Sequence, residues 1–195
     1  MDEELTSRVW SREQLERITN LDREKFMPRT PVLAALEPGQ GQAIADVGAG
    51  LGWLSFPIAE QVGSRGKVFA LEPSAEAVAE LTRRAEEQKL AQLVAIETFA
   101  EHLPLADQSV DGVIWHTVAL MMGDRRQALS ESFRIVRPGG RLVVVDWKII
   151  ETASGPPLER RVPEDLLAEE ARAQGFTLKG RFDPGPVTWG LVFQR

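Results

Sequence analysis

Short apolar runs alternate with longer stretches of helical periodicity over most of the chain. The runs are four to six residues long, several are rich in β-branched side chains, and they lie at residues 43–47, 67–71, 93–96, 110–115 and 142–145. Continuous apolar runs of this length are typical of strands that are buried on both faces of a parallel sheet. The pattern therefore predicts five such strands.

Helix-capping signals fall between most of these runs. We expect one helix over residues 51–62, before Gly63, a second from Ser74 to about residue 89, and a third from Asp124 to about residue 136. A last helix is expected over residues 163–174. Serine and aspartate at a helix start accept hydrogen bonds from the free N–H groups of the first turn, and glycine commonly ends a helix.

Two shorter helices are expected ahead of the first strand. Ser11 and Gln14 have the spacing of a capping box. Thr30 before Pro31 is typical of an N-cap followed by a first-turn proline, and the Pro-Gly pair at 38–39 would end that helix.

The C-terminal segment predicts a β-hairpin, with strands at 176–182 and 187–193 joined by residues 183–186. Strand-helix alternation followed by a hairpin indicates an α/β fold: a doubly wound, Rossmann-like, seven-stranded sheet that is mostly parallel and has one antiparallel strand from the hairpin. At 195 residues the chain suits one domain, 1–195. Within it, residues 1–38 would cover an acceptor site, 43–148 would form the donor-binding core, and 175–195 the hairpin.

Composition and charge narrow the classes of function. A net charge of -6 argues against nucleic acid as a partner, because phosphate binding needs a basic surface. No apolar run reaches the length of about 18 residues that a membrane helix requires, and the acidic N-terminus does not resemble a secretory signal, so we expect a cytoplasmic protein without membrane insertion. With no cysteine and only two histidines, no metal site is expected.

The segment Asp46-Val47-Gly48-Ala49-Gly50-Leu51-Gly52 follows the first predicted strand and opens the first long helix. Glycines at such a junction let the backbone turn sharply and bring a ligand against the main chain, where a Cβ atom would collide with it. The alternative is a glycine-rich turn that binds nothing.

A single acid, Glu72, stands 24 residues after Gly48, at the end of the second predicted strand. A carboxylate at this position can accept hydrogen bonds from both ribose hydroxyls of an adenosine group. Alone, Glu72 also fits a solvated charge at a strand end; together with the glycine loop, it favours nucleoside binding.

These motifs resemble those of class I S-adenosylmethionine-dependent methyltransferases, in particular the small-molecule branch that includes quinone-biosynthesis enzymes. The resemblance covers residues 43–148 in register. The glycine loop resembles the family's first motif, the segment 98–104 its adenine segment, 111–116 its fourth strand, and 137–142 the turn into its fifth. It implies S-adenosyl-L-methionine as cofactor and the following binding residues: Asp46, Gly48, Ala49, Gly50, Glu72, Ala100 and Glu101.

The adenine segment departs from the family in one position. Where an Asp often accepts a hydrogen bond from the adenine amino group, this chain has Phe99. The resemblance then leaves Glu101 to take over part of that role, the Ala100 N–H to serve adenine N1, and Phe99 to add apolar contact.

A nicotinamide dinucleotide is the rival cofactor, because a glycine loop and a strand-end acid would serve it as well. The loop reads G-x-G-x-G, and Trp53 stands where a dinucleotide fingerprint has its third small residue. The chain also has no tyrosine, unlike short-chain dehydrogenases. Neither a P-loop nor a G-x-S-x-G elbow is present.

His116 is the candidate catalytic residue. Methyl transfer from a sulfonium mainly requires that the acceptor be held in line with water excluded, and a base is needed only if the acceptor keeps a proton. His116 ends the fourth predicted strand, where ligands bind in such sheets, and could take that proton; a packing role is equally open. Asp146 could orient His116 or serve as a plain capping carboxylate.

The acceptor pocket is expected to form from the N-terminal helices, the segment after His116 and the loop 149–161. Six side chains would make it apolar: Trp10, Phe26, Met27, Met121, Met122 and Trp147. The leading acceptor is therefore a small apolar or aromatic molecule, and the absence of cysteine argues against arsenite. Two alternatives stay open: a module that binds S-adenosylmethionine to regulate or scaffold without transfer, and a nicotinamide-dependent reductase.

Overall fold

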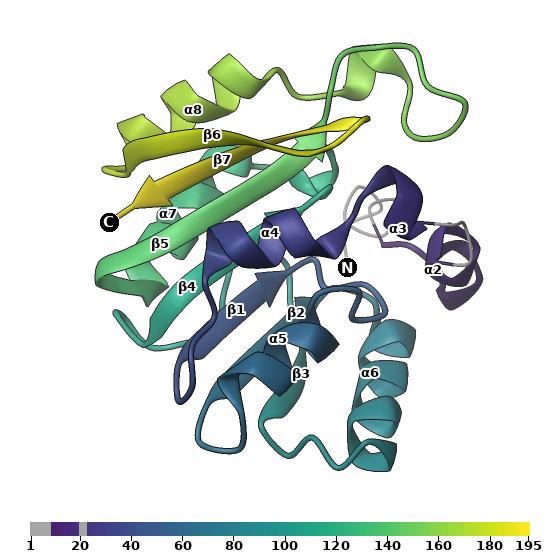
Figure 1. The fold of residues 1–195 in the computed structure, drawn as a ribbon, viewed down its shortest axis with the longest axis vertical. Coiled ribbons are helices and arrows are strands. Elements are labelled where there is room, and N and C mark those ends of the chain that lie inside the picture. The colour runs from purple at the N-terminus through teal and green to yellow at the C-terminus, as the bar shows by residue number, and fades with distance from the viewer. Residues whose placement is uncertain (1–8, 20–22) are drawn as a thin grey trace.

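The computed structural model describes residues 9–19 and 23–195, and in it one seven-stranded sheet crosses the molecule in the order β3-β2-β1-β4-β5-β7-β6 (Figure 1). The strands are β1 (Ala43–Val47), β2 (Lys67–Glu72), β3 (Leu93–Glu97), β4 (Val110–His116), β5 (Val136–Trp147), β6 (Thr177–Gly185) and β7 (Thr188–Gln194). Strands β1 to β5 are parallel, and β7 pairs antiparallel with both β5 and β6. The predicted fold class is confirmed.

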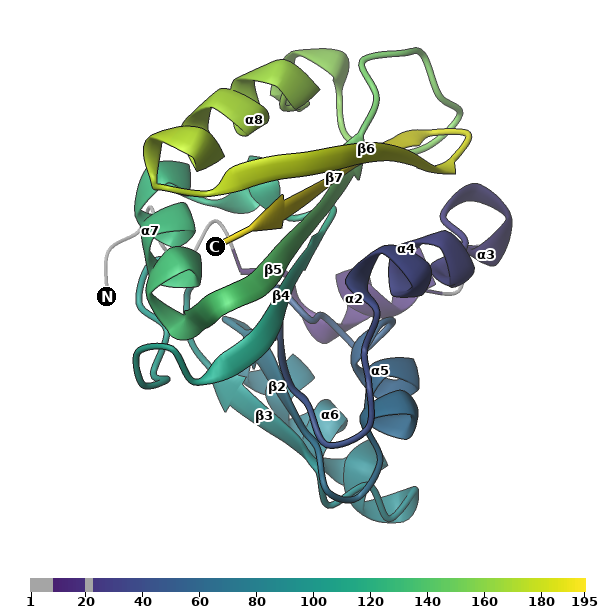
Figure 2. The same cartoon turned by 60° about the vertical axis from the view of Figure 1, so that its left-hand side comes forward.

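Helices cover both faces of this sheet, as Figures 1 and 2 show. The described helices are α2 (Arg12–Thr19), α3 (Arg23–Phe26), α4 (Arg29–Leu36), α5 (Ser55–Val62), α6 (Ala75–Glu87), α7 (Arg125–Ile135) and α8 (Glu164–Ala173), with short 3₁₀ turns at η1 (Ala119–Met121) and η2 (Leu158–Arg160). Among the described residues, none of the helices combines the length and apolar character needed to cross a membrane.

Two apolar clusters hold the three layers together. Side chains of α4, α5 and α6 pack on one face against Ile114 and Val143. Those of α7 and α8 pack on the other face against Trp115 and Val144. Because successive side chains of a strand point to opposite faces, each continuous apolar run in the sequence supplies both clusters.

Three predicted helix caps are present. Ser11 and Gln14 exchange the two hydrogen bonds of a capping box at the start of α2, Ser74 Oγ accepts from the N–H of Ala77, and Asp124 accepts from the N–H of Gln127. These contacts form within three residues, so local sequence is enough to predict them.

The predicted cap at Thr30 is wrong. Helix α4 starts two residues earlier than predicted, at Arg29, with Pro28 as an extended N-cap in place of Thr30. The Arg29 N–H donates to the Glu24 carboxylate, which lies outside the helix. Pro31 still lies in the first turn, where its missing N–H costs nothing. The helix ends at Leu36, before the predicted Pro-Gly pair, because Glu37 adopts a left-handed conformation with φ of 51°.

Three other boundaries also differ from the prediction. Helix α5 begins at Ser55, because residues 51–54 form turns that continue the glycine loop. Strand β5 starts at Val136 and so includes the Pro-Gly-Gly turn. In the hairpin, β6 runs on to Gly185, which leaves residues 186–187 as the turn.

Candidate functional site

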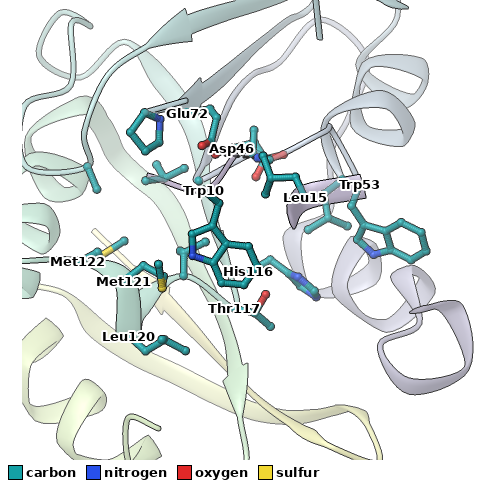
Figure 3. A pocket seen from close by; sticks show the side chains of 18 of the residues that line it. Trp10, Leu15, Asp46, Trp53, Glu72, His116, Thr117, Leu120, Met121 and Met122 are labelled. Atoms are coloured by element: carbon teal, nitrogen blue, oxygen red, sulfur yellow. Dashed lines mark hydrogen bonds between the residues drawn. The ribbon is translucent and has the colours of Figure 1, made fainter. Parts of the chain in front are cut away.

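A cavity of about 600 Å³ opens at the carboxyl ends of β1, β2 and β4. Figure 3 shows Glu72 and Asp46 on one side of it and Leu120, Met121 and Met122 on the other, with Trp10 and His116 between them. This is the edge where ligands bind in open α/β sheets, and the volume is that of a small-molecule site.

The glycine loop supplies the floor of the cavity. Gly48, Gly50 and Gly52 all have positive φ, at 72°, 54° and 83°. A Cβ added at Gly52 would collide with Phe56 and Leu81, so that glycine serves packing, whereas one added at Gly50 would meet only Leu15, at 3.6 Å. Gly50 therefore leaves its space to the cavity.

Glu72 is tied directly to this loop. Its Oε2 accepts a hydrogen bond from the Gly50 N–H at 2.9 Å, and its Oε1 accepts one from the Ser74 N–H at 3.2 Å. Burial raises the pKa of Glu72, and the two backbone bonds oppose that rise. A carboxylate oxygen can accept more than one bond, so each oxygen keeps capacity for a ligand hydroxyl.

Asp46 lines the cavity at the end of β1 and is also buried. Its Oδ2 accepts a hydrogen bond from Ser55 Oγ at 2.6 Å, and burial raises its pKa to about 6. The contact with Ser55 links β1 to the first turn of α5, across the glycine loop.

The predicted adenine segment reaches the same cavity, which Thr98, Phe99, Ala100 and Glu101 all line. One oxygen of Glu101, Oε1, accepts hydrogen bonds from the N–H groups of Gly123 and Asp124, at 2.8 and 3.0 Å. Glu101 thus holds the start of α7, a structural role that the sequence did not suggest.

His116 is buried at the end of β4, beside an arginine that the sequence analysis missed. Arg23 Nη2 lies 3.1 Å from His116 Nδ1 and 3.4 Å from Thr117 Oγ1. Because a guanidinium can only donate, Nδ1 is the acceptor and the proton of the neutral ring is on Nε2. Burial, and then the charge of Arg23, hold the pKa of His116 well below its usual value, which makes it a weaker base than expected.

Asp146 does not orient His116. Its Oδ2 accepts from the Ala119 N–H at 3.1 Å and its Oδ1 from its own neighbour, the Trp147 N–H, at 2.7 Å. Of the two roles considered for Asp146, the structure places it as the capping carboxylate of η1.

The far end of the cavity is apolar. All six side chains expected for an acceptor pocket line it: Trp10, Phe26, Met27, Met121, Met122 and Trp147. The loop after β5 contributes residues 154–157, with Gly155 packed against the Trp147 indole. No pattern in the sequence pointed to Arg23, because nothing local links it to residues 116 and 117.

A family model described as a methyltransferase domain matches residues 45–144, which include the end of β1, the glycine loop, Glu72, His116 and most of β5. The chain belongs to this methyltransferase family. Its relatives and its fold are those of class I S-adenosylmethionine-dependent methyltransferases, as the resemblance implied.

Curated relatives of this methyltransferase have diverse names. An arsenite methyltransferase of Halobacterium salinarum is 28% identical over 133 residues, covering 68% of this chain and 33% of that protein. A ubiquinone/menaquinone biosynthesis C-methyltransferase of Bartonella henselae is 33% identical over 114 residues, covering 55% of this chain and 42% of that protein. The chain thus spans less than half the length of either relative.

Solved structures share the fold over nearly the whole chain. A methyltransferase from Aquifex aeolicus has a TM-score of 0.88 at 22% identity, covering 94% of this chain and 98% of that one. A geranyl diphosphate methyltransferase, solved with its diphosphate and sinefungin, has a TM-score of 0.73 at 16% identity, covering 85% and 77%. At these identities the likeness concerns the fold.

The residues of this cavity fit S-adenosylmethionine, the cofactor of the family. Glu72 retains acceptor capacity for ribose hydroxyls, and Gly50 leaves its space to the cavity beside that carboxylate. The cofactor would supply an activated methyl group on sulfur.

Proposed function

We propose that this methyltransferase moves a methyl group from S-adenosyl-L-methionine to a small, partly apolar acceptor. The observation that carries the proposal is that one cavity has a polar end, with Gly50 and Glu72, and an apolar end, with Met121 and Trp147. A nucleoside suits the first end, and an aromatic or aliphatic molecule suits the second.

For the donor, we propose binding through seven residues: Asp46, Gly48, Ala49, Gly50, Glu72, Ala100 and Glu101. Glu72 would bind the ribose, and the backbone of the glycine loop would contact the bound S-adenosyl-L-methionine. Glu101 already accepts hydrogen bonds from the N–H groups of residues 123 and 124, so any hydrogen bond to the adenine would be additional to these two. No metal ion is part of the proposal.

For the acceptor, the chain's role is to orient it and exclude water, since in-line placement is most of what this reaction requires. The N-terminal residues within 1–38 supply Trp10, Phe26 and Met27 to the lining of the cavity, which fits the predicted division of a single domain. Arsenite is not proposed as the acceptor, because the chain lacks the thiolates that such a soft ligand prefers.

His116 remains our candidate catalytic residue. In a base role it would take the acceptor's proton, and His116→Ala would then lower turnover on a hydroxyl acceptor by roughly 10²-fold while leaving donor affinity nearly unchanged. A fully active variant would reduce His116 to packing.

Binding and turnover test the function separately. S-adenosylmethionine and S-adenosylhomocysteine should raise the melting temperature, because a ligand that binds only the folded state stabilises it. Nicotinamide dinucleotides should not; tight binding of a dinucleotide alone would favour the reductase. A screen of metabolite extracts with radiolabelled donor should then yield a labelled product, whereas binding without any product would favour the regulatory module.

A cytoplasmic location also stays a prediction.

A further inference from the structure

Among the described residues, Arg23 is one of two arginines that line the cavity; the other, Arg160, lies beside Met121. Its side chain leaves α3 and reaches the end of β4, where its described hydrogen-bond partners are His116 Nδ1 and Thr117 Oγ1. The guanidinium carbon lies 5.2 Å from the centre of the Trp53 ring. All three partners are uncharged.

The acids of the cavity leave this charge largely uncompensated. Within the described part of the chain, no carboxylate lies within ion-pair distance of Arg23. Asp46 is the acid that acts on it electrostatically, but its Oδ2 is bonded to Ser55. Burial lowers the pKa of Arg23 to about 10, so the side chain stays charged at neutral pH.

A half-buried charge without a direct counter-charge is costly, and a ligand that brings an anion would reduce that cost. We propose that Arg23 recognises an anionic oxygen of the methyl acceptor, either a carboxylate or an ionised hydroxyl. This inference rests on the proposed function and names the chemical class of the acceptor.

Arg23 lies at the end of β4, where its two polar contacts are to His116 and Thr117, and it also acts electrostatically on Asp46. We assign the anion to the acceptor, and the comparison with methylthioadenosine below separates it from the donor's own carboxylate. An acceptor that binds ionised needs no base, so the base role proposed for His116 applies only to an acceptor that binds with its proton. The positive charge of Arg23 would favour that ionised form.

The test is calorimetric and uses two probes of nearly equal shape, benzoate and benzamide, added to the protein saturated with S-adenosylhomocysteine. Wild-type protein should bind benzoate more tightly than benzamide. Arg23→Gln should weaken benzoate binding by roughly 10-fold or more, as expected for loss of a charged hydrogen bond, and leave benzamide binding unchanged. Arg23→Lys should keep part of the preference, because the charge remains.

Arg29→Gln is the matched control. Arg29 stacks on the same Trp53 ring, at 4.5 Å, but pairs with Glu24 and does not line the cavity. The Arg29→Gln variant should bind benzoate and benzamide as tightly as the wild-type protein does. Melting curves of the three variants establish that they are folded; if Arg23→Gln does not fold, the preference of Arg23→Lys, reduced but present, carries the test.

The donor's own carboxylate is the other source of an anion, and one further comparison separates the two. If Arg23→Gln lost affinity for S-adenosylhomocysteine but not for methylthioadenosine, which lacks the carboxylate, Arg23 would serve the donor and the inference would be overturned. Wild-type protein that binds benzoate no better than benzamide would overturn it as well. Failure of the wild type to bind S-adenosylhomocysteine would instead count against the proposed function.

Discussion

The carboxylate of Glu72 accepts a hydrogen bond from the backbone N–H of Gly50, 22 positions away, over 2.9 Å. This bond joins the end of β2 to the loop that follows β1, and it fixes the position of an acid beside a cavity-lining glycine at which an added Cβ would meet only Leu15, at 3.6 Å. The carboxylate proposed to hold the ribose and the open space at Gly50 thus belong to one small structure.

Glu72→Ala should weaken binding of S-adenosylhomocysteine by roughly 10- to 150-fold, because charge-assisted bonds to two hydroxyls contribute on the order of 1.5 to 3 kcal/mol. Since the ribose is remote from the reacting methyl, the loss should appear mainly as a higher donor KM, with kcat changed far less. Glu97→Ala is the control, because Glu97 is the exposed residue in register with Glu72 on β3. Unchanged affinity in Glu72→Ala would mean that the ribose is held elsewhere.

Gly50→Val should abolish donor binding in a folded protein, because its side chain would occupy the space beside Glu72. Gly139→Val provides the comparison: Gly139 has φ of 82° and nothing within 4 Å of an added Cβ, but it lies outside the cavity. Both variants carry a backbone strain of about 1 to 2 kcal/mol. Calorimetry with S-adenosylhomocysteine should separate them; equal affinities would show that the loop does not hold the donor.

Asp46 should make stability depend on pH in a definite direction. Its pKa is raised from 3.8 to about 6, so the folded protein holds this proton more tightly than the unfolded chain does. The resulting stability is present below the unfolded pKa and is lost as pH rises through about 6. The Asp46→Asn variant does not lose stability in this way, because asparagine does not ionise. Its unfolding free energy relative to wild type should therefore rise between about pH 4 and pH 7, by on the order of 3 kcal/mol.

Urea denaturation at several pH values measures this difference. Asp183→Asn is a control of opposite sign, since Lys148 holds the pKa of the exposed Asp183 below its usual value. A relative stability of Asp46→Asn that did not change with pH would contradict the role of burial.

Arg161→Gln should loosen the loop that forms one wall of the cavity. The buried Arg161 guanidinium donates to the carbonyls of Lys148, Ile150 and Pro156 and to Thr152 Oγ1, at 2.6 to 3.0 Å. Its loss leaves those carbonyls without their donor and should cost about 2 to 4 kcal/mol.

Denaturation and limited proteolysis within residues 148–157 measure the effect of Arg161→Gln. Arg172→Gln is the control, because Arg172 is exposed: this variant should keep the wild-type stability and the wild-type resistance of the loop to protease. A loop that resisted protease as well in Arg161→Gln as in wild type would show that the Trp147 and Gly155 contact is sufficient to hold it.

Short-range patterns in the sequence determined most of the fold. Apolar runs predicted the five parallel strands and the hairpin pattern predicted the last two, and the caps at Ser74 and Asp124 bond to backbone groups only three residues away. The glycine loop and Glu72 could also be found, since a strand-turn-helix junction brings its own residues together. Where a boundary was wrong, as at Thr30, a group from outside the element decided it: the Glu24 carboxylate bonds the Arg29 N–H.

Only the tertiary structure decided what the strand-end side chains contact. Arg23 and His116 are 93 positions apart, and Asp146 bonds the N–H of Ala119, 27 positions away. Glu101 likewise bonds the backbone at residues 123 and 124. A periodic pattern specifies which face of an element is buried, but not which distant side chain reaches that face. The sequence by itself therefore determined the sheet and the glycine loop. Packing of the N-terminal helices and the loops onto the sheet edge determined which charged and hydrogen-bonding side chains meet around His116.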